Sequence, residues 1–446
     1  MNQVVDIKKV LCGKNIVIFS FFVALILFYS FVGYKEKIPT YMFGMRSLLA
    51  IFSFSAVIVA VKSRVDFFLL QKFYTICIAL LIFLLRFLFV SSGEDFLGPS
   101  YDSYAYLSFG SSFSTLSYPS FLDKLVSIGY NRDDYGFFSI VYWVAQFVND
   151  RYSIATILVV FNVLLLYNSA IYLYKLGVMV GLINKVAQII SVVWLTFPFL
   201  IITIACGLKE VVFCSIIIFA MYHIYVYKVE SRIISFLYAL LFIVCTYFFR
   251  TAIALMLVLS FFVCVVINEN NKKVIIFFCA FSVMLMNILL PYVIGLVGVD
   301  SESVFAIAEA RMSAKESSGS ISMFLPYVAS FFGPFPNMNR TDSYGFMHSY
   351  GLFLKCSLSF FFLYGVWYKL KKIDIRWIPI IVFIFCNIVM LIIAGTTLDM
   401  RYHITYIPFF FLLAFDTMQV YKYKYYFFYM IFVLLLVFIY NTRALD

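Results

Sequence analysis

The sequence contains few charged residues, because Asp, Glu, Lys and Arg together make up only 12% of its 446 residues. A soluble domain carries roughly 25% charged residues, so a soluble chain of this length would lack the polar surface needed to cover its core. Hydrophobic residues account for 64% of the chain. The composition therefore excludes an ordinary soluble globular protein.

Histidine and paired cysteine motifs are also scarce. The chain has 3 His and 9 Cys, and no two cysteines are spaced as CxxC. Zinc sites need several His or Cys ligands at short spacing, so we expect no metal, no cofactor and no disulfide framework. The net charge of +11 is typical of basic residues that anchor cytoplasmic loops. We expect no nucleic-acid partner, because no soluble fold with a basic stripe is available to bind one.

Long apolar segments recur along the chain, many of them near the roughly 20 residues that a bilayer crossing needs. They predict an all-α polytopic membrane protein in which residues 1–446 form a single integral membrane domain. About thirteen transmembrane helices are expected, at Ile16–Val32, Tyr41–Val61, Phe73–Ser91, Ala155–Tyr174, Val186–Ala205, Val211–Val226, Ile233–Phe249, Thr251–Ile267, Val274–Val297, Phe346–Tyr368, Ile378–Ala394, Tyr402–Asp416 and Tyr425–Tyr440.

The distribution of charge predicts the orientation of these spans. Basic residues gather in alternate connections, which the positive-inside rule places in the cytoplasm; examples are Lys62, Arg64, Lys175, Lys185, Lys272, Lys273, Lys369, Lys371 and Lys372. Acidic residues gather in the other connections. The first apolar run follows Lys8, Lys9 and Lys14 and has no small-residue cleavage site, so we expect a retained first span and a cytoplasmic N-terminus.

Two large loops are expected on the outer side, at about 92–153 and 300–345. Within the first loop, Phe137–Val148 is too short to cross a bilayer, and its apolar residues lie at helical spacing. We predict an amphipathic helix in the outer interface, with the pair Asp133-Asp134 as its N-cap. In the second loop, Phe332-Gly333-Pro334-Phe335-Pro336 predicts a rigid re-entrant turn.

Four cations fall on the outer side against the general charge bias, namely Lys209, Arg250, Arg311 and Arg401. Each alone could cap a helix or extend its charge to the interface. Gathered together, they suit a pyrophosphate or another anionic head group, which an Arg guanidinium can grip with two parallel hydrogen bonds.

Asp102 is a candidate general base toward a sugar hydroxyl, because we expect it in an aromatic outer loop just past a span; the alternative is an Asp that forms a turn. His403 could relay a proton or bind phosphate, or could be structural. Tyr101 and Tyr104 could stack on sugar rings or pack against lipid.

Taken together, these features resemble the Wzy-type O-antigen and capsular polysaccharide polymerases, within or near the GT-C superfamily of polytopic membrane glycosyltransferases. The resemblance is in the overall layout and in short motifs: Tyr101-Asp102-Ser103-Tyr104, the interfacial helix after Asp133-Asp134, Pro198 within a span, Gly207-Leu208-Lys209-Glu210, Arg250, Gly333-Pro334-Phe335-Pro336 and Asp399-Met400-Arg401-Tyr402. The chain departs from the family pattern in one respect. Some of these polymerases carry paired Arg-rich motifs in their two large periplasmic loops, whereas the first loop here has no Arg motif to match Arg311.

The resemblance implies a location in the bacterial inner membrane and an undecaprenyl-pyrophosphate-linked oligosaccharide as substrate, joined into polymer at the periplasmic face. It also implies Asp102 as base and Arg250, Arg311 and Arg401 as the grip on the lipid phosphate. A chain-length regulator and a flippase are the partners expected in such a system. Three other functions stay open. The first is a GT-C glycosyltransferase with a polyprenyl-phosphate sugar donor. The second is a flippase or transporter of lipid-linked sugars, for which Lys355 near the middle of a span is the relevant charge. The third is a non-catalytic membrane scaffold, which the set of outer cations disfavours.

Overall fold

The computed structural model describes residues 40–62, 65–91, 93, 95–96, 101–130, 134–148, 150–268, 270–271, 277, 327–335, 343–394, 396, 400–420 and 425–442. All regular secondary structure within these ranges is helical. The predicted spans Ile16–Val32 and Val274–Val297, together with Arg311, lie outside the described residues.

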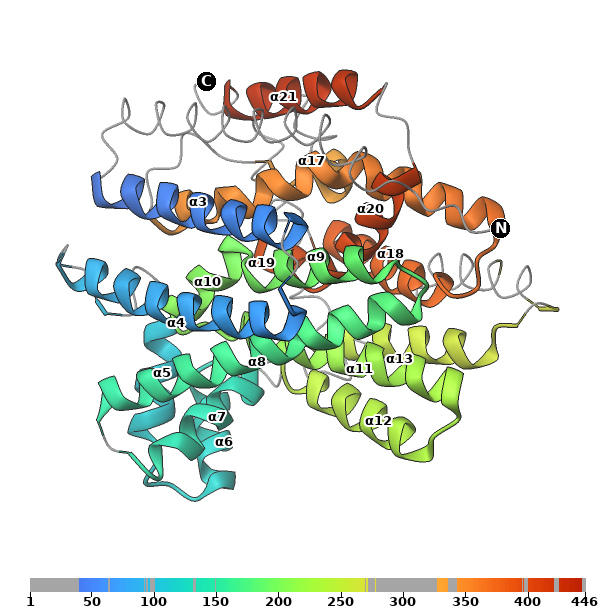
Figure 1. Ribbon diagram of the computed structural model, residues 1–446. Helices are drawn as coiled ribbons and strands as arrows, with labels where there is room; N and C mark the ends of the chain where they lie inside the picture. Colours follow the sequence, from blue (N-terminus) through green and yellow to red (C-terminus); the bar gives the residue numbers. More distant parts are fainter. Residues whose placement is uncertain are drawn as a thin grey trace.

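Long apolar helices form the body of the molecule and run roughly alongside one another (Figure 1). They are α3 (Thr40–Lys62), α4 (Phe67–Ser91), α8 (Arg151–Met179), α9 (Asn184–Leu195), α10 (Pro198–Ala205), α11 (Glu210–Glu230), α12 (Ile233–Tyr247), α13 (Thr251–Val266), α17 (Ser343–Lys372), α18 (Ile378–Ile393), α20 (Ile407–Val420) and α21 (Tyr426–Thr442). Each overlaps a predicted span, although α4 begins six residues before the prediction.

Four of the apolar segments are long enough to cross a membrane by length and composition: Phe67–Ser91, Arg151–Met179, Asn184–Ala205 and Glu210–Glu230. Several shorter apolar helices accompany them. The prediction of an all-α membrane protein is confirmed at this level, and the figure of thirteen spans stays a prediction.

The centre of the bundle is the segment that contains α9 and α10. Its most apolar stretch is 94% buried inside the protein, whereas the corresponding stretch of α4 is 39% buried. Pro198 divides this segment into two helices, because proline lacks a backbone N–H and begins a helix more readily than it continues one. The helix α10 accordingly begins at Pro198, after Phe197 in an extended conformation.

The first large outer loop contains more helix than the sequence predicted. The interfacial helix is confirmed as a helix, α7 (Tyr135–Ala145), and it packs against α5 (Tyr101–Ser112). A further short helix, α6 (Tyr118–Ser127), buries Phe121 and Leu125. These three helices gather beside one end of α8 (Figure 1). Polar residues every few positions in α5 hid its helical character from the periodicity.

The Gly-Pro turn of the second large loop is buried in the bundle. Residues 327–332 form a short helix that ends at this turn. The ammonium group of Lys355 on α17 donates hydrogen bonds to the carbonyl oxygens of Ser330, at 3.5 Å, and of Gly333. Lys355 therefore holds the turn by binding its backbone carbonyls, which compensates for the cost of burying a cation.

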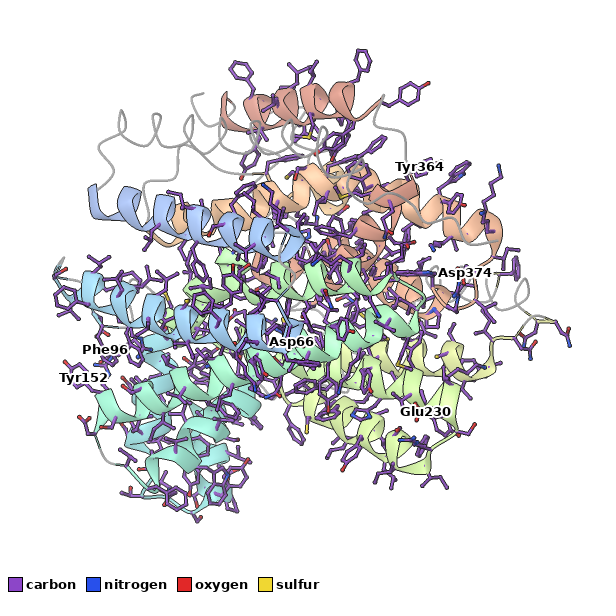
Figure 2. The ribbon with its side chains drawn as sticks, in the orientation of Figure 1. Asp66, Phe96, Tyr152, Glu230, Tyr364 and Asp374 are labelled. Carbon is purple, nitrogen blue, oxygen red and sulfur yellow. The ribbon has the colours of Figure 1, made fainter. Side chains whose placement is uncertain are left out.

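The two ends of the bundle carry different connections. Phe96 and Tyr152 lie toward one end, where α4 ends and α8 begins, and Glu230 and Asp374 lie toward the other (Figure 2). This grouping agrees with the alternate sides that the charge pattern predicts for these residues.

Candidate functional site

Charged residues from separate elements meet at the end of the bundle where α5, α7 and the turn before α11 come together. We call this group the charged cluster. Its members are Asp102, Asp134, Lys209, Glu210, Arg250 and Arg401.

Arg401 lies in the short helix α19 (Met400–His403) and connects two carboxylates. Its Nε donates a hydrogen bond to Oε1 of Glu210 at 2.8 Å, and its Nη1 donates one to Oδ2 of Asp102 at 2.7 Å. Both are charge-assisted hydrogen bonds, which are the stronger class. One guanidinium thus ties α5, α11 and α19 together although the residues are far apart in sequence.

The turn between α10 and α11 presents Lys209 and Glu210. Gly207 adopts a left-handed backbone conformation with φ of 67°, which glycine reaches without steric cost. The N–H of Leu208 bonds to the carbonyl of Thr203 at 2.9 Å, so a Schellman motif ends α10. Arg86 donates to another late carbonyl, that of Ala205, at 3.0 Å.

Lys209 is almost fully buried and forms an ion pair with Asp134 at the start of α7. Burial and then the nearby charge of Arg250 lower the pKa of the Lys209 ammonium, while Asp134 and Glu210 oppose this shift. Asp134 occupies the predicted N-cap position of α7, but its side chain makes no capping hydrogen bond. The neighbouring Asp133 lies outside the described residues.

A close approach of two backbones sets the start of α7 against the connection from α12 to α13. The N–H of Gly136 donates to the carbonyl of Phe248 at 2.9 Å. A β-carbon added at Gly136 would lie 2.6 Å from the ring of Phe249. Glycine is therefore favoured here. The contact lies two residues after Asp134 on one segment and just before Arg250 on the other, and the Arg250 guanidinium lies 5.0 Å from the centre of the Tyr402 ring.

Tyr106 lies among the carboxylates of the charged cluster. Burial, followed by the charges of Asp134, Glu210 and Asp102, raises the pKa of the Tyr106 hydroxyl far above its usual value. The ring also lies 5.7 Å from the ammonium of Lys209. Tyr106 thus lines the site with an uncharged side chain. Its neighbours in the sequence are apolar and did not indicate that role.

Asp102 differs from its predicted setting, because it lies in the first turn of α5 and not in an irregular loop. Its carboxylate is partly exposed and is bound to Arg401. Tyr101 begins α5, and its side chain is outside the described part of the chain. Tyr104 is exposed, and the guanidinium of Arg151 lies 4.8 Å from the centre of its ring.

His403 follows Arg401 in α19, but its ring is fully buried. Its Nδ1 shares a 2.6 Å hydrogen bond with the hydroxyl of Tyr406, and that hydroxyl lies 3.4 Å from the carbonyl oxygen of Ser330. This setting fits the structural alternative for His403, and its catalytic role stays a prediction.

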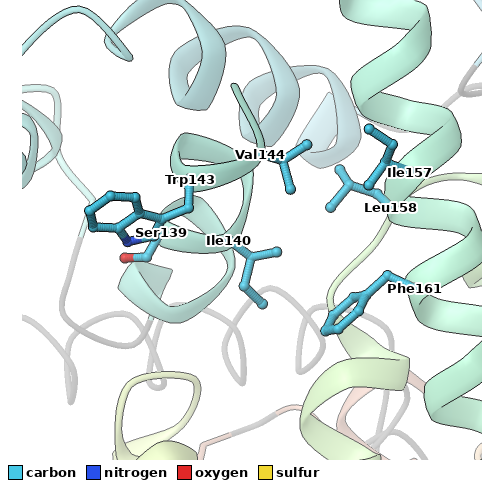
Figure 3. A pocket seen from close by; sticks show the side chains of 7 residues that line it. All are labelled: Ser139, Ile140, Trp143, Val144, Ile157, Leu158 and Phe161. Carbon is cyan, nitrogen blue, oxygen red and sulfur yellow. The ribbon is translucent and has the colours of Figure 1, made fainter. Parts of the chain in front are cut away.

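An apolar pocket lies along the part of α7 that follows its first turn. It has a volume of about 320 Å³ and is formed between α7 and α8 (Figure 3). The lining residues are Ser139, Ile140, Trp143, Val144, Ile157, Leu158 and Phe161. The same helix therefore carries Asp134 at its start and an apolar pocket one or two turns later.

The fold and the site define an all-α multi-pass membrane protein with a partly buried charged cluster at one end of its bundle. Among the described residues, no group of three or more His, Cys, Asp or Glu side chains is arranged to hold a metal ion. Comparison of the chain with protein-family models, with curated proteins and with solved structures found no match.

Proposed function

We propose that this protein is a polysaccharide polymerase that joins undecaprenyl-pyrophosphate-linked oligosaccharide repeat units at the charged cluster. The observation that carries the proposal is the meeting of Lys209, Arg250 and Arg401 with two carboxylates beside a partly exposed Asp102. Cations of this kind stabilise the negative charge that develops on a leaving pyrophosphate, and a carboxylate accepts the proton of an attacking hydroxyl.

In the proposed reaction, the hydroxyl oxygen of the acceptor sugar forms a bond to the anomeric carbon of the donor. The bond from that carbon to the lipid pyrophosphate breaks, and its electron pair leaves with the pyrophosphate. Asp102 takes the hydroxyl proton, and Arg401 with Arg250 neutralises the leaving group. The apolar pocket between α7 and α8 suits the polyprenyl part of such a substrate.

The topology that we propose has the thirteen predicted spans in the inner membrane of a bacterium, with the N-terminus in the cytoplasm and the charged cluster at the periplasmic face. A flippase would supply the lipid-linked unit, and a chain-length regulator would act on the product. Lys355 does not favour the transporter alternative, because its ammonium binds the backbone carbonyls of a buried turn.

The test is to delete the gene in the native host and to compare surface glycans on a gel after complementation. We expect the deletion strain to carry lipid A–core with a single repeat unit and no ladder. Wild type should restore the ladder, and Arg401→Ala should not. Arg232→Ala is the matched control, since Arg232 forms an exposed pair with Glu230 at the opposite end of the bundle.

Two results would count against the proposal. Loss of even the single repeat unit in the deletion strain would indicate a transferase that builds the unit or a flippase that exports it. A normal ladder with Arg401→Ala, at wild-type protein levels, would show that the reaction does not need the cation of Arg401 in the charged cluster.

A further inference from the structure

Carboxylates of the charged cluster already bind two of its cations. Lys209 pairs with Asp134, and Arg401 is shared by Asp102 and Glu210. A pyrophosphate that enters this cluster therefore meets an Arg401 guanidinium that carboxylates already occupy. The anion and Asp102 compete for Nη1 of Arg401.

The two carboxylates on Arg401 differ in exposure. The side chain of Asp102 is 42% exposed, whereas that of Glu210 is 1% exposed. Because a surface ion pair exchanges its partners for water or solute at little cost, Asp102 can leave Arg401. Glu210 cannot do so easily, because leaving Arg401 would leave its buried carboxylate without a charged partner.

Glu210 also has the geometry of a permanent anchor. Its Oε1 binds Nε of Arg401, and its Oε2 is buried with no hydrogen-bond partner among the described residues. The buried position at the start of α11 fixes the carboxylate. Arg401 is thus held from the interior by one carboxylate and covered on its exposed side by another.

We propose that Asp102 is a displaceable intramolecular ligand of Arg401, whose place is taken by the phosphate of an anionic ligand. The inference rests on the proposed function and specifies how its site opens. A diphosphate that binds Nη1 of Arg401 releases the Asp102 carboxylate from its ion pair. The released carboxylate is then able to accept a proton from the acceptor hydroxyl, so that the base is available only when the leaving group is in place.

The test measures the affinity of the purified full-length protein for inorganic pyrophosphate. Titration calorimetry is performed in nanodiscs of phosphatidylcholine, which adds no net negative charge. Because Asn competes for Arg401 without a charge, Asp102→Asn should bind pyrophosphate more tightly than wild type, by about tenfold at low salt. Arg401→Lys should bind more weakly than wild type, because it lacks the planar fork.

Asp95→Asn controls for the change in net charge. Asp95 pairs with Arg151 at 3.3 Å, and the residues that follow each of them, Phe96 and Tyr152, lie toward the same end of the bundle (Figure 2). Its effect on affinity should be smaller than that of Asp102→Asn. A second variant, Asp102→Ser, also removes the charge and should likewise bind more tightly, which protects the test against a folding defect in one protein.

An Asp102→Asn affinity equal to or weaker than that of wild type would overturn the exchange, because Asp102 would then support Arg401 rather than compete for it. That outcome is distinct from failure of the proposed function, which the glycan gel reports. Suppose that the deletion strain kept a normal ladder while Asp102→Asn bound pyrophosphate more tightly. The ligand exchange at Arg401 would then stand, and the proposed polymerase function would be wrong.

Discussion

Arg401 shares its guanidinium between two carboxylates whose surroundings differ. Glu210 is buried at the start of α11, and Asp102 is partly open to solvent at the start of α5. Burial raises the free-energy cost of leaving a charge unpaired. The two carboxylates therefore differ in how easily they can leave Arg401. The exposed pair of Asp95 and Arg151 provides a comparison within the same molecule.

Glu210→Gln should destabilise the protein strongly. The change removes the buried charge that holds Nε of Arg401, and breaking a buried pair costs about 3–5 kcal/mol. Asp95→Asn should cost under about 1 kcal/mol, because both members of its pair are more than one third exposed. Thermal unfolding in detergent measures both variants, and equal shifts in Tm would contradict the assignment of Glu210 as the buried anchor.

At the scale of elements, turns rather than helix centres set the site. Gly207 ends α10, Arg250 precedes α13, and Gly136 lets α7 approach the connection from α12. The local backbone determines each position. Gly207 adopts a left-handed conformation, Arg250 stands at the start of a helix, and Gly136 allows a close contact. The charged cluster is the result of several helix ends that meet.

Gly136→Ala should destabilise the packing of α7, because the new β-carbon would lie 2.6 Å from the Phe249 ring. Overpacking of this kind costs about 1–3 kcal/mol. The double variant Gly136→Ala with Phe249→Leu should recover part of the loss, since the smaller side chain leaves room for the β-carbon. A double-mutant cycle on Tm values measures the coupling, and strictly additive effects would show that the two residues do not constrain each other.

The connection between α17 and α18 has an acid-sensitive ion pair. Burial raises the pKa of Asp374, but hydrogen bonds from Arg376 and the charges of Arg376 and Lys369 outweigh it and lower the pKa overall. A lowered folded-state pKa stabilises the protein above the ordinary Asp value of about 3.9, and this stability is lost as the pH falls through the folded-state pKa.

Asp374→Asn should therefore be less stable than wild type at neutral pH, and the difference should shrink only below about pH 4. Unfolding of both proteins in detergent over a pH series measures it. The position lies far from the charged cluster, so polymer formation at neutral pH serves as a check that the site is intact. A difference that stays constant down to pH 2 would contradict the ion pair as its source.

At the scale of the whole molecule, the bundle has two chemically distinct ends. Tyr152 is exposed at the end that carries α5 to α7, and Glu230 is exposed at the other end (Figure 2). If the bundle spans the membrane as the charge pattern predicts, these two positions face opposite compartments.

Tyr152→Cys should react with a membrane-impermeant maleimide in intact cells, and Glu230→Cys should react only after the cells are opened. The parent chain is the background control, since the described cysteines are buried or partly buried. Labelling of both variants, or of neither, in intact cells would contradict the proposed orientation. The measurement is independent of any enzymatic activity.

The sequence by itself determined the class and most of the helices. Runs of apolar residues marked α8, α11 and α18 because a bilayer crossing demands both length and hydrophobicity, and these are properties of a contiguous segment. Gly207 also indicated the turn before Lys209, whereas Pro198 was expected within the single span Val186–Ala205, which the structure divides into α9 and α10. By contrast, the mixed polar and aromatic composition of Tyr101–Ser112 carries no clear period, so α5 was missed.

Only the tertiary structure decided which charges meet. Asp102 and Arg401 are 299 positions apart in sequence, and no local pattern records that they form a pair. The same holds for Lys209 with Asp134 and for the burial of His403. Helix periodicity reports the face that a helix buries, whereas the partner of a charged group depends on how distant helix ends pack together, which is a property of the assembled bundle.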